Sequence, residues 1–311
     1  MFRSHKFPPP GRLIDVGGHR LHIWEQGTGP HTVVFDAALG ASCLSWSLVQ
    51  PEVAKFVRTV SYDRAGLGWS DAGPEPRTAL RVVGELHALL VRAQVPPPFI
   101  LVGHSYGGFS VRLFAAKYPE LVSGLVLVDV PDPREWANPS PVNLRRLQIG
   151  ARLSRRGALA ARLGIARLVS WLATSGARGM ARIAVSFVDG GTMDRVDQDR
   201  ILAPMNRVPR EFHPALRYLW TQPRFFQALA GQMECLVESA QQVLAAGPMG
   251  NIPLVVLTAA NAAPARLAQQ EETARLSTRG KHLLARHSGH WIALEEPNLV
   301  VQAVRDVISM E

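Results

Sequence analysis

Residues 99–108 read FILVGHSYGG, an apolar run that ends in a serine between glycines. The four apolar residues at 99–102 are typical of a strand buried on both faces of a parallel sheet. Residues 103–107 then match the pattern G-x-S-x-G, and a helical pattern follows over residues 105–118. In this strand–turn–helix context the pattern predicts a nucleophile elbow, a sharp turn that exposes the Ser105 hydroxyl above the sheet.

Short apolar runs alternate with helical patterns on both sides of this elbow. Strand-like runs lie at residues 19–26, 32–35, 59–62, 125–128, 252–257 and 282–285, and helical patterns at 78–92, 265–278 and 297–309. Strands that alternate with helices predict an α/β fold with a mostly parallel central sheet. Residues 133–247 interrupt the alternation, because they are rich in Arg, Ala and Leu and lack strand-like runs. We therefore expect an α/β core of residues 1–132 and 248–311, with residues 133–247 as a helical insertion between the sixth and seventh strands.

Composition narrows the class of protein. The chain has 311 residues, 47% of them hydrophobic, which suits one large α/β domain or a core with an insertion. The net charge is +9, and residues 133–247 alone hold 16 Arg, no Lys and 8 Asp or Glu. We find no zinc-finger spacing and no RNA-binding aromatic motif, so we expect no nucleic-acid partner. Cys43 and Cys235 lie far apart in the sequence, which predicts two reduced, buried thiols and no metal site.

The sequence also indicates where the protein works. Residues 1–12, MFRSHKFPPPGR, lack the apolar segment of a secretory signal, and no run approaches the roughly 18 apolar residues of a membrane span. We therefore expect a cytoplasmic protein. The arginines and leucines between residues 144 and 168 could form a helix that lies on an anionic membrane surface. A solvated helix face, with arginine stems covering apolar surface, is the favoured interpretation. Nothing in the sequence indicates an oligomeric state.

Four segments together resemble the α/β-hydrolase family over essentially the whole chain. They are residues 33–46 (VVFDAALGASCLSW), 61–71 (SYDRAGLGWSD), 101–108 (LVGHSYGG) and 288–297 (SGHWIALEEP). The resemblance implies the α/β-hydrolase fold, with a helical cap inserted after strand six and placed over the nucleophile. It also implies a serine hydrolase that needs no metal or other cofactor.

The same resemblance assigns roles to particular residues. His290 follows the last strand, where the family has its general base. The backbone N–H groups of Leu39 and Tyr106 would form the oxyanion hole, although residues 37–39 read Ala-Ala-Leu where the family usually has His-Gly-X. Residues 63–70 match the turn D-R-x-G-x-G-x-S. We interpret this turn as structural, with its Asp and Arg side chains satisfying backbone groups or each other.

The acid that orients the base histidine is missing from its usual place. In most of the family it follows the seventh strand, and that position falls on Ala262. No Asp or Glu lies between Met249 and Gln270. A subset of the family takes its acid from the end of strand six, and Asp129 ends the sixth strand here. We therefore predict Asp129 as the acid, with Asp132 as the alternative.

The substrate is the least determined part of the prediction. Apolar side chains in and near the insertion offer a lining for a hydrophobic substrate, although they could equally pack the cap against the core: Trp171, Trp220, Phe225, Phe226, Met233 and Trp291. The expected activity is hydrolysis of a carboxylic ester or lactone through an acyl-enzyme. An amidase or iminopeptidase, a carbon–carbon bond hydrolase and a non-catalytic ligand-binding protein remain as alternatives.

Overall fold

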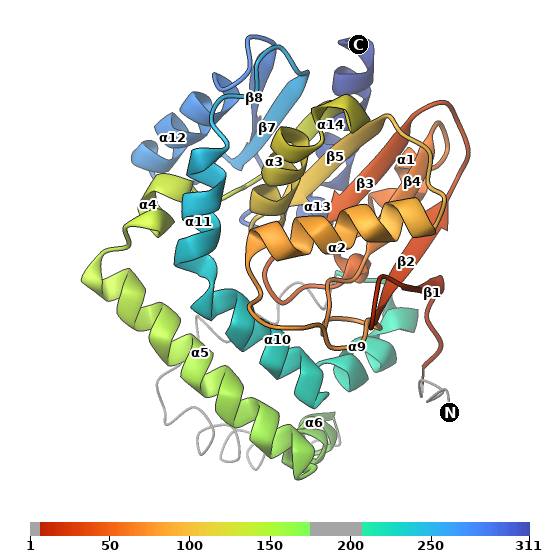
Figure 1. The fold of residues 1–311 in the computed structure, drawn as a ribbon, viewed down its shortest axis with the longest axis vertical. Helices are drawn as coiled ribbons and strands as arrows, with labels where there is room; N and C mark the ends of the chain where they lie inside the picture. Colours follow the sequence, from red (N-terminus) through yellow and green to blue (C-terminus); the bar gives the residue numbers. More distant parts are fainter. Residues whose placement is uncertain (1–6, 175–206) are drawn as a thin grey trace.

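A single mixed sheet organises the computed structural model, which describes residues 7–174 and 207–311, without the side chains of residues 170–174 (Figure 1). Its strands are β1 (Arg12–Asp15), β2 (Arg20–Gln26), β3 (Thr32–Asp36), β4 (Arg58–Tyr62), β5 (Phe99–His104), β6 (Val122–Val128), β7 (Leu254–Ala259) and β8 (Gly280–Ala285). They lie in the order β1-β2-β4-β3-β5-β6-β7-β8. β2 is antiparallel to β1 and to β4, and the other neighbours are parallel, so the predicted mostly parallel sheet is confirmed.

Helices cover both faces of the sheet. α2 (Ala79–Arg92), α3 (Gly107–Lys117) and α11 (Leu236–Ala245) pack on one face. α1 (Gln50–Val53), α13 (Ile292–Glu295) and α14 (Pro297–Ser309) pack on the other, and α12 (Pro264–Ala274) lies against β7 and β8. Successive strand residues point to opposite faces. In β3, Val34 therefore joins the first core cluster, whereas Val33 and Phe35 join the second. This two-sided burial explains why the central strands read as unbroken apolar runs.

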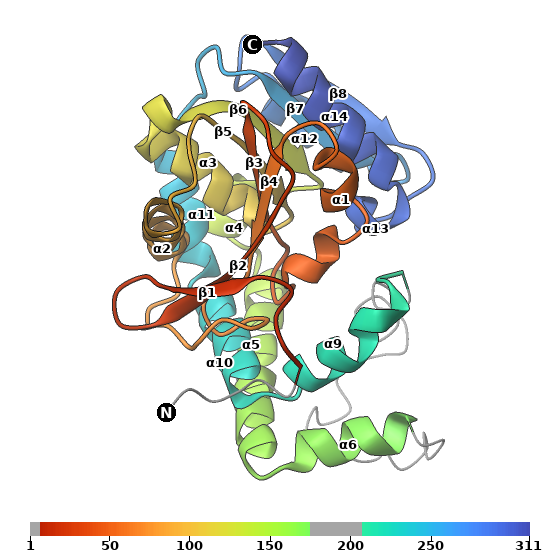
Figure 2. The ribbon, with the colours of Figure 1, turned by 90° about the vertical axis from the view of Figure 1, so that its right-hand side faces the viewer.

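In the part of the chain that the structure describes, every regular element between β6 and β7 is a helix. The helices are α4 (Pro133–Ala137), α5 (Pro141–Arg162), α6 (Ile165–Thr174), the short 3₁₀ helix η4 (Arg210–Phe212), α9 (His213–Leu219), α10 (Pro223–Glu234) and α11. In both ribbon views, α5, α6, α9 and α10 lie together on one side of the sheet, away from α14 (Figures 1 and 2). α5 packs along α10, and Arg155 pairs with Glu234 at 2.6 Å. The last helix, α11, belongs instead to the core cluster of α2 and α3. The division of core and cap at residues 133 and 247 stays a prediction.

Two smaller expectations concern the membrane and the cysteines. No helix in residues 7–174 or 207–311 combines the length and the apolarity that a membrane span needs.

Both cysteines have free thiols. Cys43 is buried as expected, whereas Cys235, at the junction of α10 and α11, is partly exposed.

Candidate active site

Ser105 occupies the sharp turn between β5 and α3, as the G-x-S-x-G pattern predicts. Its φ of +51° is a left-handed conformation that residues other than glycine seldom adopt. The flanking glycines permit the close packing of this turn. A Cβ on Gly103 would lie 2.7 Å from the backbone of Gly107, and a Cβ on Gly107 would clash with the Asp36 carbonyl oxygen. The Ser105 N–H donates to the Val128 carbonyl at 3.0 Å, which fixes the turn to the end of β6.

The carboxylate of Asp129 lies against His290. The His290 Nδ1–H donates to Asp129 Oδ2 over 2.5 Å, although the two residues are 161 positions apart. Asp129 follows β6, the strand next to β5, so it lies one strand away from the elbow. Its N–H donates to the Leu257 carbonyl on β7 at 2.8 Å, and its φ of +44° is again left-handed. Asp129, the predicted acid, therefore contacts the predicted base.

The surroundings of Asp129 keep its carboxylate ionised. Burial by itself would raise the pKa of Asp129, but the hydrogen bond from His290 and the positive charges nearby lower it overall. One of these charges is Arg266, whose Nη2 lies 3.8 Å from Asp129 Oδ1 and 3.3 Å from the Asp129 carbonyl oxygen. Arg266 stands in the first turn of α12, just beyond Ala262. Arg266 is not among the predicted site residues, and an arginine four residues beyond Ala262, the position that lacks the usual acid, is the signal that could have pointed to it.

His104 connects the elbow to His290. This residue precedes Ser105, is completely buried, and its Nε2–H donates to the His290 carbonyl oxygen at 2.7 Å. Its ring also lies 4.8 Å from the His290 ring, centroid to centroid. Burial, with the nearby charge of His290, lowers the pKa of His104 to about 3, so this imidazole is neutral near pH 7. The His290 side chain is 44% exposed, so it remains open to a substrate.

Asp132, the alternative acid, is engaged elsewhere. Its side chain accepts the Arg134 N–H at 2.8 Å and forms the N-terminal cap of α4. The Arg134 guanidinium also pairs with it at 2.9 Å. The structure therefore brings Asp129, and not Asp132, to His290. The turn after β7 that contains Ala262 presents no carboxylate there.

The two amides predicted for the oxyanion hole belong to adjoining segments. Tyr106 follows Ser105 directly and is the N-cap residue of α3. Leu39 lies in the loop after β3, and Asp36, the last residue of β3, pairs with Gly103 of β5. No described residue accepts a hydrogen bond from either amide. The left-handed position of this loop falls on Gly40, with φ of +69°, so Ala38 does not need a conformation that only glycine favours.

Arg64 binds the same loop through its backbone carbonyl groups. Its buried guanidinium pairs with Asp36 at 2.7 Å and donates to the carbonyl oxygens of Ala37, at 2.7 Å, and Ala38. It also lies over the Tyr106 ring, 5.0 Å from its centroid. Arg64 is predicted to satisfy backbone groups or Asp63, and in the structure it binds backbone groups and Asp36. One side chain thus contacts both segments that carry the candidate oxyanion amides.

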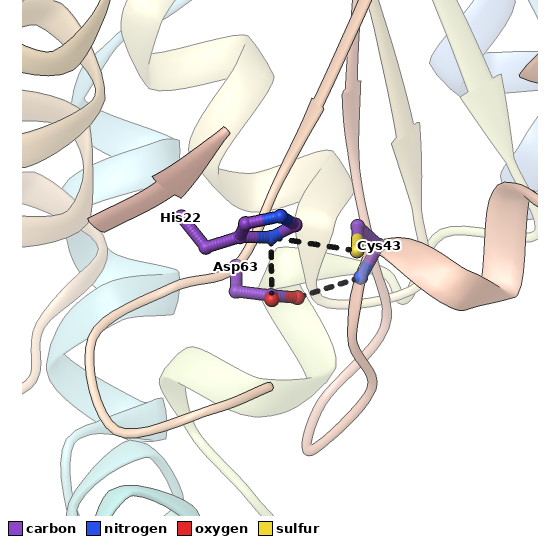
Figure 3. A group of neighbouring side chains, drawn as sticks. All are labelled: His22, Cys43 and Asp63. Atoms are coloured by element: carbon purple, nitrogen blue, oxygen red, sulfur yellow. Dashed lines mark hydrogen bonds and ion pairs between the residues drawn. The ribbon is translucent and has the colours of Figure 1, made fainter. Parts of the chain in front are cut away.

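Asp63 belongs to a separate buried cluster with His22 and Cys43 (Figure 3). The His22 Nδ1 lies 2.9 Å from Asp63 Oδ2 and 3.7 Å from the Cys43 Sγ. These atom types can bind a metal ion. Both carboxylate oxygens, however, already accept backbone N–H groups, from Cys43 at 2.8 Å and Trp69 at 3.0 Å. Burial raises the pKa of the Cys43 thiol well above its usual range, so the metal-binding thiolate is disfavoured. The cluster fits a structural junction of β2, η1 (Cys43–Trp46) and the 63–70 turn.

The tryptophans predicted to line the substrate site differ in position. Trp291 lies beside the site, with its ring 5.9 Å from the His290 ring and 5.1 Å from the His104 ring. Trp220 is the C-cap residue of α9, and its ring stacks on the Phe225 ring with centroids 6.1 Å apart. Trp171 lies on α6, and its side chain is outside the described residues. Phe226 packs against α5, where its ring faces Gly157.

Solved structures share this fold. A thermophilic esterase from Thermogutta terrifontis superimposes with a TM-score of 0.64 at 20% sequence identity, covering 96% of this chain and 97% of that chain. The enol-lactonase from Burkholderia xenovorans LB400 superimposes with a TM-score of 0.60 at 16% identity, covering 96% of this chain and 100% of that chain. At these identities the likeness concerns the fold alone.

Sequence comparison agrees with this likeness. The uncharacterized protein YqjL of Bacillus subtilis (strain 168) is 38% identical over 119 residues, which cover 38% of this chain and 47% of that protein. The chain spans less than half the length of the curated relatives of this kind, 43% and 47% for two of them. A model of the alpha/beta hydrolase family matches residues 33–303. Since that match covers most of the sequence and the fold agrees with it, the chain belongs to the alpha/beta hydrolase family.

Proposed function

We propose that the protein is a serine hydrolase that cleaves a carboxylic ester or a lactone through an acyl-enzyme. The observation that carries this proposal is the 2.5 Å hydrogen bond from His290 Nδ1 to Asp129, at the sheet edge where Ser105 takes its left-handed conformation. A serine needs a neighbouring base to become a good nucleophile, and a base histidine works best when a carboxylate fixes its tautomer. Family membership supports a hydrolase of this kind.

The proposed reaction uses only side chains and backbone amides of this chain. Because Asp129 binds the Nδ1–H of His290, Nε2 is free to take the proton of the Ser105 hydroxyl as its oxygen attacks the carbonyl carbon. The N–H groups of Leu39 and Tyr106 stabilise the oxyanion of the tetrahedral intermediate. His290 then returns the proton to the leaving alkoxide, which leaves as the alcohol. Water repeats the sequence on the acyl-enzyme, releases the carboxylic acid and restores Ser105.

Apolar surface near the site supports a hydrophobic acyl group. Trp291 lies next to His290, and Trp220 with Phe225 offers a second aromatic surface in the inserted helices. The similarity in fold to an esterase and to an enol-lactonase is consistent with an ester or lactone substrate. We propose that the described helices α9 and α10 contribute to a cap over this surface.

The direct test measures hydrolysis of p-nitrophenyl esters of graded chain length, with lactones and anilides alongside. We expect turnover of esters or lactones that disappears in Ser105→Ala, and labelling of Ser105 by a fluorophosphonate probe in the folded wild-type protein. Cleavage of anilides in preference to esters would contradict the ester assignment. Failure of the probe to label Ser105 would contradict the serine mechanism itself and favour a binding protein.

A further inference from the structure

A cavity lies at the sheet edge opposite to Ser105. It measures about 600 Å³ and is bordered by the start of β6, the C-terminal half of α3 and the loop that precedes β7. Parallel strands place their amino ends at one edge and their carboxyl ends at the other, so this cavity is separate from the candidate active site. Its charged or hydroxyl-bearing lining residues are Arg112, Ser123, Arg279 and Glu311.

Arg112 is a buried cation without a partner. It is only 6% exposed, and it forms no ion pair or hydrogen bond with the described residues; its Nε is completely buried. Other buried arginines of this chain are paired, Arg64 with Asp36 at 2.7 Å and Arg77 with Glu85 at 2.6 Å. A buried guanidinium without an acceptor destabilises a fold, because it loses hydration and gains nothing in return.

The carboxylates near Arg112 are already occupied. The carboxylate whose charge acts on Arg112 is Asp132, which binds Arg134 at 2.9 Å. Glu311, at the border of the cavity, lies 3.1 Å from His31. Burial lowers the pKa of Arg112 to about 10, yet the side chain still carries its charge at neutral pH.

The neighbours of Arg112 add to its suitability for an anion. The Ser123 hydroxyl is also buried without a hydrogen-bond partner, so it is available as a further donor. Arg279 brings a second positive charge to the lining, and its guanidinium forms no ion pair within the described residues. Apolar side chains complete the walls, among them Ala115, Val122 and Ile252.

We propose that this cavity binds a small organic anion, whose carboxylate or phosphate group accepts hydrogen bonds from the Arg112 guanidinium and the Ser123 hydroxyl. A planar guanidinium presents paired N–H groups that match both kinds of acceptor. A short apolar part of the ligand would lie against Ala115, Val122 and Ile252. The proposal is independent of the reaction at Ser105.

The experiment is isothermal titration of the whole chain with inorganic phosphate and, separately, with butyrate, with sodium chloride at equal ionic strength as the blank. We expect saturable binding of at least one probe to the wild-type protein and to Ser105→Ala. Arg112→Met should weaken it by about 10- to 100-fold, as expected for a lost charge-assisted hydrogen bond. The matched control is Arg275→Met, because Arg275 is an exposed arginine that pairs with Glu271 outside the cavity. It should bind like wild type.

Each result of the titration has a distinct meaning. Binding of phosphate alone assigns a phosphate group to the ligand, and binding of butyrate alone assigns a carboxylate group. Absence of saturable binding to wild type, or equal affinity in Arg112→Met, overturns the proposal. Methionine fills the place of the apolar arginine stem, so this variant should fold. Should it not, Ser123→Ala provides the second measurement, with an expected loss of about fivefold or more in affinity if the hydroxyl contacts the anion.

Discussion

Ser105 and Asp129 share a backbone geometry that is uncommon for their residue types. Both have positive φ, +51° and +44°, and Gln94 is the one other non-glycine residue with this conformation in the described part of the chain. Strained backbone of this kind persists only where the surroundings hold it, and it is enriched at functional sites. Hydrogen bonds to neighbouring strands hold both residues, from Ser105 to β6 and from Asp129 to β7. The strain therefore coincides with two of the positions that the proposed reaction needs, the nucleophile and the acid.

Asparagine substitutions at the two candidate acids test the assignment. Asp129→Asn keeps the size of the side chain but removes the charge that selects the His290 tautomer, and we expect turnover to fall by about 10⁴-fold, as in serine proteases. Asp132→Asn should keep nearly full turnover, because asparagine also caps helices well. The measurement is kcat for the best ester, with the melting temperature of each variant as the control for folding. The opposite pattern of activities would assign the acid to Asp132.

Arg64 offers a test of how the oxyanion loop is positioned. Lysine at this position keeps the charge beside Asp36 but cannot reach both carbonyls that precede Leu39. We expect Arg64→Lys to lower kcat by about 10- to 100-fold with little change in KM, since a displaced oxyanion donor acts mainly on the transition state. Affinity for a trifluoromethyl ketone, which mimics the tetrahedral intermediate, should fall by a similar factor. A variant that loses stability but keeps this affinity would show that Arg64 is only structural.

At the scale of elements, two helical glycines should respond in opposite ways to alanine. Gly107 begins α3, and a Cβ there meets the backbone of Asp36 and Ala37, so Gly107→Ala should destabilise by about 1–3 kcal/mol or more. Gly84 lies in the middle of α2 with no atom within 4 Å of an added Cβ. Gly84→Ala should therefore stabilise by about 0.5–1 kcal/mol. Urea denaturation of both variants measures the change in the free energy of unfolding. A similar change at both positions would contradict the close packing of the elbow.

Helices and strands with a strong hydrophobic pattern were predictable from the sequence. Those that depend on tertiary contacts were not. The helix expected at residues 78–92 is α2, whose N-cap is Thr78, and the apolar run at 125–128 lies within β6. β1 has no such pattern, because Arg12–Asp15 is an edge strand that exposes both of its ends. Its extended form comes from pairing with β2. α13 is only four residues long, too short for its periodicity to be recognised.

The same distinction applies to the candidate site. A local motif predicts Ser105, whereas Asp129 followed from the missing acid at Ala262 and from a family resemblance. The partners of the 63–70 turn could not be predicted. Asp63 binds His22, 41 positions away, and Arg64 binds Asp36, 28 positions away. No local periodicity encodes such pairs, because only the completed sheet brings them together.

At the scale of the whole molecule, burial of His104 makes the stability depend on pH. The pKa of this imidazole is about 3 in the folded chain and about 6.5 in an unfolded one. Between these values the unfolded chain binds one more proton than the folded chain, so the free energy of unfolding must fall as the pH falls through this window. The slope from this one group approaches about 1.4 kcal/mol per pH unit.

His104→Gln isolates that contribution. Glutamine cannot titrate, but its amide N–H can still donate to the His290 carbonyl oxygen. Urea denaturation of both proteins at several values between pH 7 and pH 4 gives the free energy of unfolding, and the wild type should lose stability more steeply on acidification. All titratable groups other than His104 are common to the two proteins, so the difference between the slopes isolates the contribution of His104. Any constant cost of the substitution shifts one curve without changing its slope. Parallel curves would mean that His104 binds its proton as readily in the folded chain as in the unfolded one, which would contradict the lowered pKa of this buried imidazole.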